Sequence, residues 1–184
     1  SAFEHAESLK IRNRVYNRTS DYFFLRGRFK GIQEKFVATA SVSLLHLKRD
    51  VDGIQYLMDQ LRDSTSLSSA REIEGRIDVL FENTGGQLDY LEGVFPSVSE
   101  AVVALEKAKS VSPEEVVLLE EELLWYEQDI DEGRMVEKSN FDSLASRAEE
   151  LSAAPFPTEF FAGAVLLLLG AVLFYKKGFL KKGM

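Results

Sequence analysis

The chain has 184 residues, a formal net charge of −8 and no cysteine. The lack of cysteine excludes disulfides, thiolate metal sites and cysteine nucleophiles, and the length allows one domain of about 150 residues beside a short further segment. The charge is divided along the chain. Residues 1–49 hold ten basic and four acidic side chains, whereas residues 50–159 hold eight basic and twenty-six acidic side chains.

Residues 1–19 are interpreted as a basic N-terminal segment. The wider stretch from Lys10 to Lys30 interleaves Arg and Lys with Tyr and Phe, a mixture that can dock on an acidic protein surface, an anionic membrane or single-stranded nucleic acid. Because the remainder of the chain is acidic, we expect no nucleic-acid partner. An ordinary helix whose bases face water or pair with the acidic half explains the same pattern.

Residues 20–152 are predicted to form an acidic helical bundle, since apolar residues recur there at intervals of three and four. The first amphipathic region runs from about Asp21 to Leu61, with Gly27, Gly31 and Gly53 as candidate bends. Its predicted buried positions are Phe29, Ile32, Phe36, Leu44, Leu47, Val51, Ile54, Leu57, Met58 and Leu61.

The next helix is predicted to start at a capping box formed by Ser69 and Glu72, and to break or kink at Asn83-Thr84-Gly85-Gly86. A short apolar face over residues 87–95 follows. Pro96 and a second capping box, Ser97 with Glu100, then predict another helix start.

Ser112 and Pro113 predict a further start, since serine caps a helix and proline fits its first turn. The expected buried stripe of this helix is Val116, Leu119, Leu123, Tyr126 and Ile130. A last helix is expected near residues 140–151. Four or five helices with short connections indicate an up-and-down bundle.

Residues 153–158 are predicted to be a linker, and residues 159–184 a transmembrane helix with a lysine-rich tail. The stretch 160–175 has no charged residue, and a helix extended to about 157–180 is long enough for the ~30 Å hydrocarbon core of a bilayer. The fold class we predict is therefore all-α: an up-and-down helical bundle followed by a single C-terminal transmembrane helix. A buried C-terminal hairpin is disfavoured because no comparably apolar run exists for it to pack with.

The charges that flank this span predict its orientation. Four lysines follow Tyr175, whereas Glu149, Glu150 and Glu159 precede the span, so the tail is expected on the cytoplasmic-equivalent side and the bundle across the membrane. A start at Ser1 without Met fits removal of a targeting peptide, and equally removal of an initiator Met. The competing topology is a tail-anchored protein with its domain in the cytosol.

Within the span, Gly163 and Gly170 lie seven residues apart, so that small residues form a stripe against which another helix can pack closely. A specific contact of this stripe within the membrane and ordinary anchorage both fit the spacing. We expect no cofactor in this protein. A chlorophyll on the span, with Glu159 as its ligand, is the alternative for a photosynthetic membrane.

Three segments resemble PsbQ-type proteins, the small extrinsic subunits on the lumenal side of photosystem II. LHLKRDVDGIQYL (45–57) is similar to the Leu-Arg-x-Asp-Leu segment of the family's second bundle helix. VLFENTGGQLDYLEG (79–93) is similar to the next helix, and KSVSPEEV (109–116) to a Ser-Pro-acid helix start. The resemblance covers about residues 44–130 and implies a lumenal four-helix module of an oxygenic thylakoid.

The chain departs from this family in two respects. PsbQ-type proteins are soluble or lipid-anchored, whereas this chain has a predicted membrane helix of its own. The family's proline-rich N-terminal arm is also absent from SAFEHAESLKIRN. Both departures put in doubt whether the module occupies the usual place on photosystem II.

No motif for catalysis stands out. His5 and His46 have no partner motif, and His46 is expected to be a satisfied or half-exposed residue of an amphipathic helix. Glu120 to Glu122 are adjacent in the sequence and therefore point in different directions around a helix, which is typical of a solvent-exposed face. A diiron site would need Glu-x-x-His pairs, which the sequence lacks. We predict no catalytic, cofactor-binding or metal site.

The predicted function is that of a non-catalytic structural or linker subunit of a membrane protein complex, most specifically a thylakoid photosystem or photosystem–antenna supercomplex. The bundle would lie in the lumen and the tail in the stroma. Its partners would bind through the Gly163/Gly170 helix face and the Lys10–Lys30 segment. The alternative is a tail-anchored helical adaptor or docking protein with its domain in the cytosol.

Overall fold

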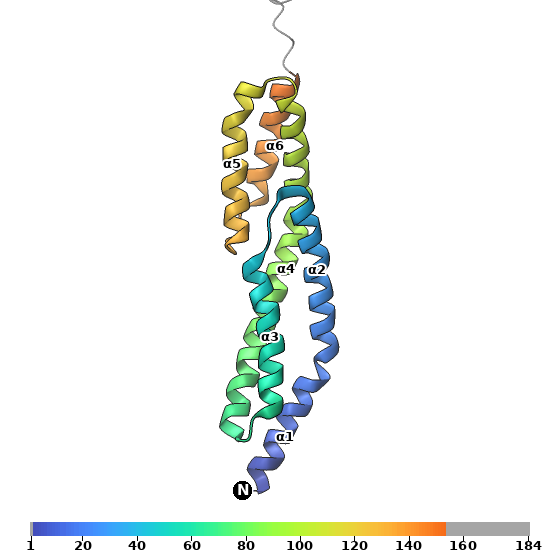
Figure 1. The fold of residues 1–184 in the computed structure, drawn as a ribbon, viewed down its shortest axis with the longest axis vertical. Helices are drawn as coiled ribbons and strands as arrows, with labels where there is room; N and C mark the ends of the chain where they lie inside the picture. The colour runs from blue at the N-terminus through green and yellow to red at the C-terminus, as the bar shows by residue number, and fades with distance from the viewer. Residues whose placement is uncertain (1, 154–184) are drawn as a thin grey trace, which may run out of the picture. The chain divides into compact units, whose positions relative to one another are not determined.

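The computed structural model describes residues 2–153, and all regular secondary structure in this part is helical (Figure 1). The helices are α1 (Ala2–Asn17), α2 (Thr19–Ala40), α3 (Leu45–Asp63), α4 (Leu67–Lys109), α5 (Pro113–Asp131) and α6 (Lys138–Ala153). The all-α bundle predicted from the apolar periodicity is confirmed for these residues. The predicted linker beyond residue 153 and the predicted transmembrane helix, 159–184, lie outside the described residues.

Helix α4 is the central element of the bundle (Figure 1). It contacts α1, α2, α3 and α5, with α3 beside its first half and α5 and α6 beside its second half. Helices α1 and α2 follow each other along one side and are separated only at Arg18. The segment 1–19 therefore belongs to the same compact unit as the rest of residues 1–152.

The core consists of the apolar faces that the spacing predicts. Of the ten positions expected to be buried between Asp21 and Leu61, nine are buried, and Met58 is half-buried beside them. A smaller cluster lies at the N-terminal end of the bundle, where α1, α3 and α4 meet. Its members are Ile11, Val15, Leu57, Leu61, Ala70, Ile73 and Ile77.

Gly27, Gly31 and Gly53, the candidate bends, do not interrupt the chain's helices, because all three lie inside α2 or α3. The chain turns instead between Ala40 and Leu45, a segment without glycine. A helix tolerates single glycines at a cost of about 1 kcal/mol each, which tertiary packing readily exceeds.

This α2–α3 turn places two ordinary residues in the left-handed region, Ser41 with φ 55° and Leu44 with φ 52°. A residue far along the sequence stabilises this conformation. The Asp131 carboxylate, at the end of α5, accepts the backbone N–H groups of Ser43 (3.0 Å) and Leu44 (2.7 Å). The Gln33 side chain donates to the Ser43 carbonyl at 2.8 Å. Contacts remote in sequence thus decide where α2 ends.

The helix break considered at residues 83–86 and the new helix start predicted after Pro96 do not occur, since α4 continues through both over 43 residues. Its start differs from the predicted capping box as well: Ser66 is the N-cap, and its hydroxyl accepts the N–H of Ser69 at 3.1 Å. The reason for the continuity is an uninterrupted buried face. That face includes Ile77, Thr84, Leu88, Leu91, Val94, Ser97, Val98 and Ala101.

Pro96 is tolerated because of its position on the helix. It lies on the exposed side of α4, so the Glu92 carbonyl, which loses its N–H partner to the proline ring, faces solvent and can bond to water. The second predicted capping residue, Ser97, is buried inside the helix and caps nothing.

Replacing both Gly85 and Gly86 with alanine is expected to raise the free energy of unfolding by about 1–2 kcal/mol, because each glycine costs roughly 0.5–1 kcal/mol within a helix. A Cβ atom at either position meets nothing within 4 Å. Urea unfolding followed by circular dichroism would measure the gain. A destabilised double variant would show that α4 needs the glycines to bend there.

The start of α5 agrees with the prediction in position, since Pro113 is its first residue and Ser112 occupies the N-cap. The Ser112 side chain, however, makes no capping hydrogen bond. The predicted stripe is confirmed in Val116, Leu119, Leu123 and Ile130, which are buried. Tyr126 is half-buried and meets the ring of Phe141 of α6 edge-on, at 5.3 Å between centroids. The helix expected near residues 140–151 is α6.

Candidate functional site

The Lys10–Lys30 segment forms the end of α1 and the first half of α2. Its inward face contributes five buried side chains to the core, Ile11, Val15, Tyr22, Leu25 and Phe29. Its outward face exposes three aromatic side chains, Tyr16, Phe23 and Phe24. The segment therefore helps to build the bundle and also presents an aromatic surface.

Three arginines of this segment pair with acids of α4. Arg14 donates to both carboxylate oxygens of Glu74 at 3.0 Å, and Arg28 donates to Asp89 at 2.7 Å and to Glu92 at 2.8 Å and 3.1 Å. Arg18 pairs in the same way with Asp78. The sequence separation is nearly constant because α1 and α2 run in the same direction as α4 (Figure 1).

The pair around Arg28 is the strongest of these. Hydrogen bonds to Glu92 and then to Asp89 raise the pKa of the Arg28 guanidinium above its ordinary value, and the hydrogen bond from Arg28 lowers the pKa of Glu92. Arg14, Arg18 and Arg28 thus pair with the acidic half of the chain, as expected for an ordinary helix. Their charges stabilise the bundle and are not free for a partner.

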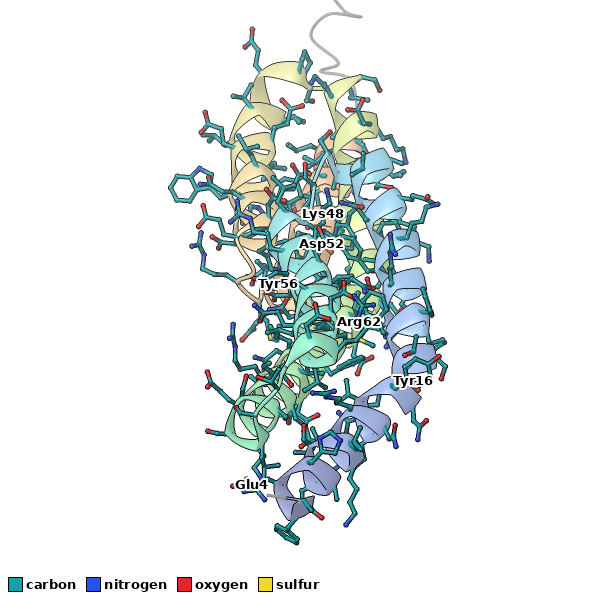
Figure 2. The ribbon with its side chains drawn as sticks, turned by 60° about the horizontal axis from the view of Figure 1, so that its bottom comes forward. Glu4, Tyr16, Lys48, Asp52, Tyr56 and Arg62 are labelled. Atoms are coloured by element: carbon teal, nitrogen blue, oxygen red, sulfur yellow. The ribbon has the colours of Figure 1, made fainter. Side chains whose placement is uncertain are left out.

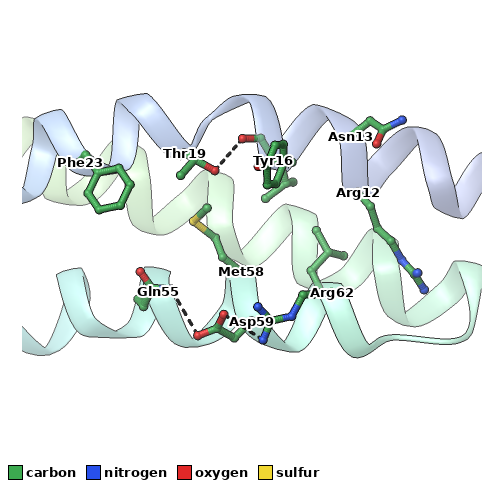
Figure 3. A pocket seen from close by; sticks show the side chains of 11 residues that line it. Arg12, Asn13, Tyr16, Thr19, Phe23, Gln55, Met58, Asp59 and Arg62 are labelled. Carbon is green, nitrogen blue, oxygen red and sulfur yellow. Dashed lines mark hydrogen bonds and ion pairs between the residues drawn. The ribbon is translucent and has the colours of Figure 1, made fainter.

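A cleft lies between this segment and the second half of α3, as Figure 3 shows. It encloses about 370 Å³. In Figure 2, Tyr16 lies on the α1–α2 side and Arg62 on α3. The remaining lining residues are Arg12, Asn13, Val15, Thr19, Phe23, Gln55, Met58, Asp59 and Leu61.

Arg12 differs from Arg14, Arg18 and Arg28. Its Nε atom is buried and has no hydrogen-bond partner among the described residues, and its side chain extends toward α3 (Figure 3). On the other wall, Arg62 lies 3.4 Å from the Asp59 carboxylate. The Arg12 guanidinium has no carboxylate partner among the described residues, so its charge is available to an acidic group from outside the chain.

The lining defines the chemistry that the cleft can accept. Guanidinium groups suit carboxylates and other anions, while the rings of Tyr16 and Phe23 and the thioether of Met58 suit apolar groups. Together they fit a protein segment that combines an acidic side chain with an apolar one. Sequence reasoning found the α1–α2 wall but missed the α3 wall, because no motif links residues about forty positions apart.

His46, expected to be a satisfied or half-exposed residue of an amphipathic helix, is half-buried in α3. Its Nδ1 donates to the Asp131 carbonyl at 2.8 Å, and its Nε2 lies 3.1 Å from the side-chain amide oxygen of Gln87. The imidazole thus joins α3, α4 and the end of α5. Its role is structural.

The acidic run Glu120 to Glu122 does not converge on one point. Glu120 binds Lys109 at 2.6 Å, and Glu122 accepts hydrogen bonds from Tyr126 (2.8 Å) and Arg147 (2.7 Å). The Tyr126 hydroxyl and then Arg147 lower the pKa of Glu122. No group of three or more His, Asp or Glu residues within residues 2–153 is arranged to hold a metal ion.

Glu127 is expected to make stability depend on pH. Burial raises the pKa of its carboxyl from 4.5 to about 7. The unfolded chain therefore releases this proton at lower pH than the folded chain, so stability falls as pH rises from about 4.5 to 7. Glu127→Gln should stabilise the protein by about 1–3 kcal/mol at pH 8 and by nothing at pH 4. Urea unfolding at both pH values measures this.

The exposed Glu115 of the same helix supplies the control, since Glu115→Gln should change stability by less than about 0.5 kcal/mol at either pH. An equal gain from Glu127→Gln at pH 4 and pH 8 would contradict the assignment, because it would show that packing and not charge is responsible.

Several predicted features lie outside the described residues, namely the Gly163/Gly170 stripe, Glu159 and the lysine tail. Among the helices that are described, none is both long and apolar enough to cross a membrane. No protein-family model, no curated protein and no solved structure matches the chain.

Proposed function

We propose that this protein is a non-catalytic interaction subunit of a membrane protein complex. The supporting observation is the cleft beside α1 and α2, where exposed Tyr16 and Phe23 flank the unpartnered Arg12. Tyrosine and arginine are the residue types that most often dominate binding energy at protein interfaces. The partner would supply an acidic and apolar segment.

The second half of the proposal is the membrane anchor over residues 159–184, with Gly163 and Gly170 facing a neighbouring helix. A tethered bundle has a high effective concentration near its partner, whereas surface charges alone are screened over about 8–10 Å at ordinary salt. High salt should therefore leave the protein bound. The two contacts together would make it a linker.

A thylakoid photosystem or photosystem–antenna complex is the setting we propose, with the bundle in the lumen and the tail in the stroma. This placement rests on the resemblance of residues 45–57, 79–93 and 109–116 to PsbQ-type proteins and on the lysines after Tyr175. Protease added to sealed membranes from the tail side should then spare the bundle. Complete digestion without lysis would favour the tail-anchored adaptor.

The cleft is tested with the triple variant Arg12→Gln, Tyr16→Ser and Phe23→Ser. Combined with Gly163→Leu and Gly170→Leu, it is expected to reduce the fraction of chain that migrates with the complex at least about tenfold, in mild detergent and high salt. Native gel electrophoresis of solubilised membranes measures this fraction. Arg14 and Arg28 are left intact because they already pair with acids of α4.

The matched control replaces exposed residues away from the cleft, Tyr56→Ser on α3 and Val103→Ser on α4, with the same two glycine substitutions. This control should retain the contact made by the bundle. If the cleft variant stays fully assembled, or if high salt alone strips the unmodified protein, the two-contact proposal is wrong.

A further inference from the structure

Helix α5 is apolar on two sides. Its inner side is buried against the bundle, whereas four large apolar residues are exposed on its outer side. Their exposed fractions are 46% for Val117, 72% for Leu118, 60% for Leu124 and 73% for Trp125. Because residues seven positions apart lie two turns apart on one face of a helix, Val117 lines up with Leu124 and Leu118 with Trp125, and these two neighbouring rows together form the outer stripe.

The rest of the bundle does not cover this stripe. Helix α5 lies at the outer edge of the bundle, on the side away from α2 (Figure 1). Its contacts with the rest of the bundle use other sides of the helix. Tyr126 meets Phe141 of α6, Glu122 pairs with Arg147 of α6 and Glu120 pairs with Lys109 of α4. Asp131 accepts hydrogen bonds from the α2–α3 turn. A stripe of this kind on one helix is unusual for a surface that faces only water.

The charges on α5 are of one sign. The helix carries eight acidic residues and no lysine or arginine. Two of them, Glu114 and Glu121, lie in line with the apolar stripe, three residues before Val117 and three before Leu124. Neither has an ion-pair partner among the described residues. The surface thus combines apolar side chains with unneutralised negative charge.

We propose that the outer stripe of α5, formed by Val117, Leu118, Leu124 and Trp125 with Glu114 and Glu121, binds a basic amphipathic helix of a partner protein. The stripe has the spacing of a heptad repeat. Glu114 and Glu121 occupy its a positions, and Val117 and Leu124 occupy its d positions. A partner helix would place apolar residues against the stripe and Lys or Arg opposite the two acids.

Charge distinguishes this occupant from two others. A second copy of the chain would bring another Glu114 and Glu121 to the same contact, and like charges in an interface are repulsive. An anionic lipid surface would be repelled for the same reason. The proposal is independent of the α1–α2 cleft, which is formed by other helices and selects the opposite charge.

Trp125 allows a direct test because it is the only tryptophan of the chain. The full chain in phosphatidylcholine nanodiscs is titrated with a tryptophan-free peptide of about three heptads, with Leu placed against the stripe and Lys against the acids. Trp125 emission should shift to shorter wavelength and saturate. A peptide of identical composition in scrambled order should leave the emission unchanged.

Charge-swap variants make the test specific. Glu114→Lys with Glu121→Lys should weaken binding of the basic peptide at least about tenfold, and should bind a peptide with Glu in place of Lys, which the unmodified chain does not bind. Leu118→Ser with Leu124→Ser should weaken both. Val103→Ser, on α4, should change neither.

Three results would overturn the proposal. The charge-swap variant could fail to bind the acidic peptide, which would show that recognition does not involve the two acids. The blue shift could appear on concentrating the protein alone, which would indicate a second copy. It could also appear on adding phosphatidylglycerol vesicles without peptide, which would indicate a lipid surface.

Discussion

Replacing Phe36 with alanine is expected to lower the free energy of unfolding by about 3–5 kcal/mol. The Phe36 side chain is completely buried in α2. Its ring meets that of Phe95 of α4 edge-on, with centroids 5.2 Å apart and an interplanar angle of 63°. The substitution would remove this aromatic pair and leave a cavity between α2 and the central helix. Urea unfolding of the full chain, followed by circular dichroism, measures the loss.

Phe24→Ala, in the same helix, is the matched control. Phe24 is 70% exposed, so the same change of side chain should cost less than about 0.5 kcal/mol. Similar costs for the two variants would mean that α2 does not pack on α4 through Phe36.

Replacing Gly133 with alanine is expected to cost about 2–4 kcal/mol, from two separate causes. Gly133 follows the end of α5 with φ 84°, a conformation that costs a residue with a side chain roughly 1–2 kcal/mol. A Cβ atom there would also lie 2.9 Å from Cδ2 of His46. The His46 ring cannot move away without losing its contacts to Asp131 and Gln87, and such overpacking costs about 1–3 kcal/mol.

A double-variant cycle separates the two causes. In a His46→Ala background, the cost of Gly133→Ala should fall to the roughly 1–2 kcal/mol of the backbone conformation. Gly75→Ala, in an open position of α4, should be neutral or stabilising. An unchanged cost in the His46→Ala background would exclude the contact with the imidazole as a cause.

The sequence by itself determined the fold class of residues 2–153. Apolar residues spaced by three and four can be buried together only when the chain is helical, so the pattern specifies both the helices and their inner faces. The start of α5 was equally local, because Pro113 fits the first turn of a helix through its own fixed backbone angle. The aromatic residues of the Lys10–Lys30 segment could likewise be identified from the sequence, because they are interleaved with its basic residues.

Tertiary packing decided where helices end. Residues 83–86 and Pro96 favour a break in an isolated helix, yet α4 continues because α2, α3 and α5 pack along it and burial outweighs a penalty of a few kcal/mol. The turn between α2 and α3 carries no glycine signal and depends on Asp131, some ninety residues away.

Packing also decided which side chains are free to bind. Arg12 and Arg14 look alike in the sequence, but Arg14 meets Glu74 whereas the Nε of Arg12 is left without a partner. In α5, apolar residues occur on both sides, and although the predicted stripe is the buried one, the spacing alone does not show whether a neighbour also covers Leu118 and Trp125. Only the neighbours of α5 show which stripe is covered, because burial is a property of the assembled helices and not of one helix alone.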